Sequence, residues 1–182
     1  MQNGCFRKLI LHMAYVWDTA SLGIRYVSKK PEFSKQDETI TIHKGHCHCG
    51  KVQFQVEAPR GFVAIDCDCS ICVAKGILHL MVPAEKLQID AQSLKALSTY
   101  QFHTKVARHT FCSTCGIHPF YTPRCNPESI SINVRCLDPS TLGTVCIEFL
   151  DGKNFTGSLS IGNNGVYYLK DNQKKAEHSI RC

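Results

Sequence analysis

The sequence predicts a mainly β domain that binds metal. Short segments alternate between apolar and polar residues, as strands with one buried face do. No long amphipathic helical pattern appears, and no apolar run reaches the roughly 20 residues of a membrane-spanning helix. Finally, seven of the 12 cysteines lie in three tight clusters, whose spacing favours metal binding.

The alternating segments begin near residue 39. Residues 39–43 alternate, and residues 51–57 place Val52, Phe54 and Val56 on one face. Residues 77–82 are apolar, which predicts a buried strand that Pro83 ends, and residues 84–87 predict one helical turn. Residues 61–65 lead into the second cysteine cluster. We expect further strands at 97–103 paired with 106–111, at 130–134 and at 145–149, with a turn at 151–152.

The chain is expected to divide into a leader, one domain and a tail. Residues 1–38 carry no cysteine cluster and are interpreted as a variable leader and linker, residues 39–169 as the zinc-binding domain, and residues 170–182 as a polar tail. The apolar stretch 9–17 faintly resembles a signal peptide and the leader's basic bias fits a mitochondrial presequence, but no good cleavage site follows. Because thiolate sites require reducing conditions, we expect a cytoplasmic or nuclear protein.

The charge balance does not point to a particular macromolecular partner. Basic residues outnumber acidic ones by 21 to 15, which gives a net charge of +6. They are spread along the chain, and no run of them forms a basic arm. Binding to nucleic acid or microtubules is therefore left open but is not indicated, and no membrane association is expected.

Two of the cysteine clusters suit a closed structural site. Cys112 and Cys115 flank a tight turn followed by Gly116, so that the turn aims both sulfurs at one point. This zinc knuckle needs a second pair of ligands. Cys47 and Cys49 can supply it, because residues i and i+2 of an extended segment point the same way. A disulfide between residues i and i+2 would be strained, so the spacing predicts a four-cysteine zinc site instead.

The third cluster predicts a second zinc ion, so that the chain would hold two. Cys67, Cys69 and Cys72 offer three thiolates within six residues, and three protein ligands with an open position are typical of catalytic zinc. Two alternatives stay open: a fourth protein ligand closes the site, or both ions are purely structural. The candidates for a fourth ligand are Cys125, Cys136, Cys146, His46, His48, His79 and His118.

Three strings resemble the successive motifs of the glutathione-dependent formaldehyde-activating enzyme family. They are Gly-His-Cys-His-Cys-Gly-Lys-Val from residue 45, Asp-Cys-Asp-Cys-Ser-Ile-Cys from residue 66, and Thr-Phe-Cys-Ser-Thr-Cys-Gly from residue 110. Segments between residues 109 and 138 look most like the centromere protein V-like branch, although the leader is not the long basic, proline-rich extension associated with that branch. The resemblance implies a β-tent fold, in which small antiparallel sheets are organised around two zinc sites. It implies a structural zinc held by Cys47, Cys49, Cys112 and Cys115 and a catalytic zinc held by Cys67, Cys69 and Cys72.

The resemblance also implies a reaction. The family forms and cleaves S-hydroxymethylglutathione from glutathione and formaldehyde, which makes the chain a candidate carbon–sulfur lyase with a small thiol substrate. Arg124 and Arg135 are candidates for binding the substrate's carboxylates. The alternative is a non-enzymatic module that binds protein, microtubules or chromatin. Asp66, Asp68 and His118 are candidates for handling the proton of the reaction, whereas His103 and His109 are expected at the surface or among satisfied strand residues.

Overall fold

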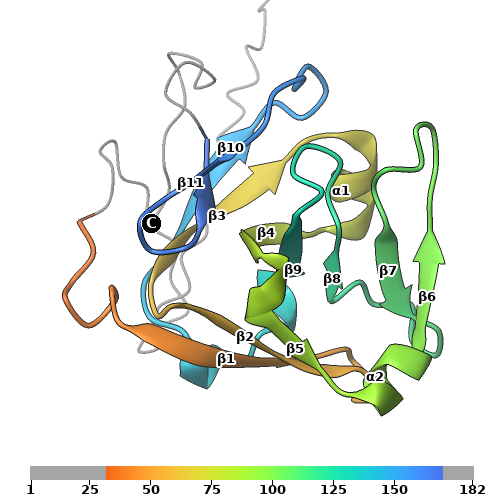
Figure 1. Ribbon diagram of the computed structural model, residues 1–182, viewed down its shortest axis with the longest axis horizontal. Coiled ribbons are helices and arrows are strands. Elements are labelled where there is room, and N and C mark those ends of the chain that lie inside the picture. Colours follow the sequence, from red (N-terminus) through yellow and green to blue (C-terminus); the bar gives the residue numbers. More distant parts are fainter. Residues whose placement is uncertain (1–31, 170–182) are drawn as a thin grey trace, which may run out of the picture.

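The computed structural model describes residues 32–169. The expectations for residues 1–31 and for the tail from residue 170 lie outside this range. The fold is mainly β, as predicted, with four small sheets among the described residues (Figure 1). Within the same range no helix is long and apolar enough to cross a membrane.

The first sheet has three antiparallel strands in the order β1-β2-β5, and it runs along the bottom of Figure 1. Its strands are β1 (Ile40–His46), β2 (Gln53–Pro59) and β5 (Leu87–Ile89). The predicted alternation of β2 is confirmed, because Phe54 is 4% exposed and Val56 is fully buried while their neighbours face solvent. This sheet therefore presents one apolar face to the rest of the domain.

The second sheet has five strands in the order β10-β3-β4-β9-β8. They are β3 (Phe62–Cys67), β4 (Leu78–Pro83), β8 (Phe120–Tyr121), β9 (Ser129–Asn133) and β10 (Val145–Leu150). The β10–β3 pair is parallel, so this sheet is mixed rather than purely antiparallel. Periodicity identifies a strand but not its partner, and such a long-range pairing cannot be read from it.

The strand pair predicted near residue 100 is confirmed as a hairpin of β6 (Leu97–Tyr100) and β7 (His109–Cys112). Both strands are shorter than expected, because His103 and Lys105 adopt positive φ angles of 48° and 56° and form a loop. The sequence did not predict helices α1 (Ser70–Lys75) and α2 (Ala91–Lys95), which are too short for a periodic pattern. It also missed β5, β8 and the small pair β11 (Ser160–Ile161) and β12 (Tyr167–Tyr168).

The main core joins the three-stranded and five-stranded sheets. Phe54 of β2 meets Phe120 of β8 edge to face, with ring centroids 5.4 Å apart. The fully buried residues around them include Val52, Phe62, Leu80, Ile132 and Val145.

The packed domain begins before residue 39. Asp37 is 9% exposed, and its carboxylate accepts a hydrogen bond from the Thr144 backbone N–H at 2.9 Å. Ser34 donates to the same carboxylate through its hydroxyl at 2.7 Å. The end of the segment interpreted as a linker is thus attached to the strand that starts at Val145.

Candidate metal centres

The structure brings Cys47, Cys49, Cys112 and Cys115 together, and we call them the four-thiol cluster. Cys47 follows β1 directly, and Cys112 is the last residue of β7. Each pair ends in a turn whose glycine has a positive φ, 75° for Gly50 and 74° for Gly116, a conformation that side-chain-bearing residues rarely adopt. The cluster therefore joins the β1–β2 hairpin to the β6–β7 hairpin.

The sulfur geometry of the four-thiol cluster suits zinc. The Sγ–Sγ distances are 3.6 Å from Cys47 to Cys49 and 3.6 Å from Cys49 to Cys112, and all four sulfurs lie within 4.8 Å of one another. Tetrahedral zinc with Zn–S bonds of about 2.3 Å requires sulfurs about 3.8 Å apart. None of the four cysteines forms a disulfide. These residues fit a closed zinc site.

Cys67, Cys69 and Cys72 form the three-thiol cluster, whose sulfurs also lie within 4.8 Å of one another. Cys67 ends β3, Cys69 is the N-cap of α1, and Cys72 lies in the first turn of that helix. The change from strand to helix folds three nearby residues around one point. The cluster fits a metal ion with three protein ligands.

The acidities of these thiols show why a cation suits the site. The pKa of Cys72 is raised far above its ordinary value, first by hydrogen bonding with Cys67 and then by Cys69 and burial. The pKa of Cys67 is raised to about 12, chiefly by its hydrogen bond with Cys69, whereas the pKa of Cys69 is lowered by the hydrogen bond from Cys67. Three adjacent thiolates repel one another, and a divalent cation would offset that repulsion.

A cavity of about 460 Å³ opens onto the three-thiol cluster, and all three cysteines line it. Much of the remaining wall is apolar, with Ile65, Met81, Phe102, Leu150, Phe155 and Leu159. Arg124 and Lys153 also line the cavity, and both are exposed to solvent. The chamber thus combines three thiols, an apolar wall and cationic side chains, and it is large enough for a small organic molecule.

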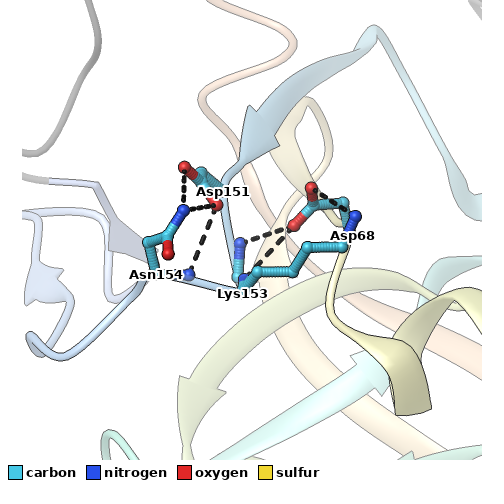
Figure 2. Close-up of polar contacts among 5 residues, drawn as sticks. Asp68, Asp151, Lys153 and Asn154 are labelled. Carbon is cyan, nitrogen blue, oxygen red and sulfur yellow. Dashed lines mark hydrogen bonds and ion pairs between the residues drawn. The ribbon is translucent and has the colours of Figure 1, made fainter.

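The loop after β10 lies against the three-thiol cluster, and its polar contacts with Asp68 are shown in Figure 2. Asp68 Oδ1 accepts hydrogen bonds from the backbone N–H groups of Gly152 at 2.8 Å and Lys153 at 3.3 Å. A Cβ added at Gly152 would collide with Cys67 Sγ, so only glycine permits this approach. Within the loop, Asn154 Nδ2 donates to the Asp151 carboxylate at 3.0 and 3.1 Å. Asp68 therefore secures this loop.

The candidates for a fourth ligand do not join the three-thiol cluster. Cys125 lines the same cavity. Among the described residues, however, no fourth side chain has a ligand atom within 4.8 Å of all three sulfurs of Cys67, Cys69 and Cys72. Cys136 is buried, and its thiol points to the carbonyl of His118 at 3.9 Å. Cys146 is fully buried in β10.

Several other candidates lie away from the cavity. His118 Nδ1 donates to the Thr110 carbonyl at 2.9 Å, and His118 does not line the cavity. Asp66 sits on β3 in register with Leu78, also outside the cavity lining. Arg135 is exposed in a short 3-10 helix, so Arg124 is the arginine that the fold brings to the cavity.

Two buried histidines line the cavity: His79, which the sequence offered as a candidate fourth ligand, and His109. His79 on β4 and His109 on β7 are each 3% exposed. Of the two expectations for His109, the surface position is therefore wrong, and a place among strand residues is the one that the structure shows. Burial lowers the pKa of each imidazole to about 4, so both are neutral at pH 7. Neither lies in a cysteine cluster, and no local pattern marks it. Only the packing of β4 and β7 reveals their place in the wall.

Comparison with known proteins identifies the family. The family model described as glutathione-dependent formaldehyde-activating enzyme matches residues 42–147, which is 106 of the 182 residues. The chain belongs to this family. It is also similar to a crystal structure of a Rhodobacter sphaeroides protein, with 41% sequence identity over 52% of this chain and 87% of that chain, and a TM-score of 0.49. Family membership is consistent with an enzyme-like role toward glutathione and formaldehyde.

Proposed function

We propose that the chain is a zinc-dependent carbon–sulfur lyase that acts on a thiol adduct such as S-hydroxymethylglutathione, formed from glutathione and formaldehyde. Two zinc ions per chain would have different tasks. The four-thiol cluster would hold a structural ion, and Cys67, Cys69 and Cys72 would hold the ion at the reaction site. Since both depend on thiolates, we place the protein in the cytoplasm or nucleus.

The observation that carries the proposal is the position of the three-thiol cluster in the wall of a substrate-sized cavity. A purely structural site is usually closed by four protein ligands. Here the sulfurs of three cysteines lie close together, and no other described residue places a ligand atom beside them. A substrate thiol would be able to serve as the fourth ligand of a zinc ion held by these cysteines, and that ion would lower the pKa of the thiol.

The chain's own residues would bind and shield the substrate. Arg124 and Lys153 carry positive charge in the cavity lining, where they complement the two carboxylates of glutathione. The Gly152 backbone covers Cys67 and excludes water from that side of the sulfur. In the synthetic direction the thiol loses its proton, a C–S bond forms as the carbonyl π bond breaks, and the oxygen gains one proton. Cleavage reverses each change.

A Cys69→Ser variant tests the role of the three-thiol cluster. Serine does not supply a thiolate, so the zinc content should fall from two ions to one per chain, and catalysed adduct formation should be lost. Elemental analysis of protein purified without chelator measures the first effect. Exchange NMR of glutathione and formaldehyde, corrected for the uncatalysed reaction, measures the second.

Ser140→Ala is the matched control, since Ser140 is exposed and its hydroxyl only donates to Asp138 at 2.8 Å. This variant should keep both ions and full activity. Full activity in a Cys69→Ser protein that holds one zinc ion would refute the proposed role of the second site.

The likeness to the centromere protein V-like branch stays a separate prediction. A module that binds microtubules or chromatin through charge would co-sediment with them at low salt and be released as salt rises. Absence of co-sedimentation at low salt would remove that alternative, whatever the outcome for the lyase reaction.

A further inference from the structure

A lysine and a histidine form a close pair beside the three-thiol cluster. Lys75 Nζ lies 2.7 Å from His109 Nδ1, joining the end of α1 to the start of β7. Lys75 is half-buried and forms no ion pair with a carboxylate among residues 32–169. Its ammonium also lies 5.2 Å from the centre of the Tyr121 ring. Removing an ammonium even partly from water costs free energy, so the position of Lys75 against His109 needs a physical explanation.

The pairing decides which nitrogen of His109 carries the proton. Burial lowers the pKa of Lys75 to about 8, so the side chain is mostly an ammonium at pH 7, and an ammonium only donates hydrogen bonds. Nδ1 of the neutral imidazole must therefore accept, which leaves the proton on Nε2. The neighbouring positive charge also withdraws electrons from the ring and makes Nε2–H a stronger donor.

Aromatic stacking fixes the plane of the His109 ring. The rings of Phe102 and Tyr121 both stack on the His109 ring, with centroid distances of 5.5 Å and 5.0 Å and an interplanar angle of 17° in each case. With Nδ1 held by Lys75 and the plane held by two rings, the direction of Nε2–H is set before any ligand arrives. Such preorganisation is what an enzyme needs at an atom where charge develops.

His79 is the other buried imidazole in the cavity wall, and it is a weaker candidate. Its Nδ1 lies 2.9 Å from Ser131 Oγ, and its Nε2 is fully buried with no partner among the described residues. A substrate atom would have to displace the packing around that nitrogen to reach it. His109 lines the cavity together with the three cysteines, and its contact with Lys75 is made through Nδ1 rather than Nε2.

We infer that His109, held by Lys75, hydrogen-bonds through Nε2–H to the oxygen of the substrate's carbonyl or hydroxymethyl group, an inference that rests on the function proposed above. As the C–S bond forms, the π electrons of the carbonyl move to this oxygen, which then takes up the one proton that the thiol released. His109 stabilises the oxygen while it is negative and keeps its own proton. His109 is a catalytic residue in this scheme, and Lys75 is a positioning residue.

Four variants test the inference by exchange NMR and elemental analysis. His109→Phe keeps a stacked ring but removes the donor, and should lower kcat roughly 100-fold with little change in KM for glutathione. His109→Gln places an amide N–H near the position of Nε2 and should recover part of that loss. Lys75→Met should lower kcat about tenfold at unchanged KM, and Lys75→Arg should restore it. Each variant should keep two zinc ions per chain.

His118→Gln is the control, because it replaces another histidine, which is half-buried and lies outside the cavity. It should have wild-type kcat. A His109→Phe protein with two zinc ions and a kcat within threefold of the wild type would overturn the inference while leaving the lyase function intact.

A second readout separates failure of the inference from failure of the proposed function. In protein labelled with ¹⁵N-histidine, the His109 Nε2 signal should shift when glutathione and formaldehyde are added together, but not with glutathione alone. If the wild type shows no turnover, the lyase function fails, and the inference then depends on this signal: a shift specific to the adduct supports it, and no shift refutes it.

Discussion

Replacing Gly152 by alanine should weaken zinc binding at the three-thiol cluster and leave the four-thiol cluster intact. The added Cβ would collide with Cys67 Sγ and press on the Cys69 backbone nitrogen at 3.2 Å. Because backbone and sulfur cannot yield as a flexible side-chain end can, the loop must move away. It then loses the two hydrogen bonds to Asp68 Oδ1.

The size of the effect follows from those two bonds. A hydrogen bond to a charged acceptor contributes about 1.5 to 3 kcal/mol, and partial exposure of the Asp68 side chain (25%) reduces the value here. We expect a total loss of about 2 to 3 kcal/mol, which corresponds to roughly 30- to 150-fold weaker zinc binding. Titration with a coloured chelator should show one of the two ions released at much lower chelator concentration.

Lys153→Ala is the control within the same loop. It removes a 3.6 Å ion pair from a side chain that is 67% exposed but keeps the backbone N–H, so zinc affinity should barely change. If Gly152→Ala retained both ions as tightly as the wild type, the loop could not be supporting the three-thiol cluster.

Two further predictions concern stability. Burial lowers the pKa of His43, whose Nε2–H donates to the Pro59 carbonyl at 3.0 Å and whose Nδ1 lies 3.2 Å from Thr141 Oγ1. The stability that it contributes is therefore complete above pH 6.5 and is lost as pH falls below that value. Chemical denaturation at pH 7.5 and 5.5 should show a smaller decline in stability for His43→Leu than for the wild type, and equal declines would contradict this assignment. Phe54→Ala should lower the free energy of unfolding by about 3 to 5 kcal/mol because it empties a core position. Ile42→Ala, at a position that is 42% exposed, should lower the free energy of unfolding by less than about 1 kcal/mol. If the two variants lost similar amounts of stability, Phe54 would not be an important core residue.

Local pattern accounts for much of the fold. The alternation at residues 51–57 and the apolar run at 77–82 correspond to β2 and β4, because burial of one or both faces selects residue types along a strand. Spacing also grouped the cysteines into four and three, and the structure brings the same sulfurs together. Tight turns act over a few residues, so their geometry is encoded locally.

Contacts between distant residues decided the rest. Three contacts join segments whose sequences give no sign that they pair. They are the parallel pairing of β10 with β3, the approach of Gly152 to Cys67 and the contact of Lys75 with His109. The cysteine motifs by themselves determined where thiols gather and which family the chain resembles. The tertiary structure alone decided that the three-thiol cluster lines a cavity and that His109 lies in the wall of that cavity, because cavities and buried pairs arise only when elements pack against one another.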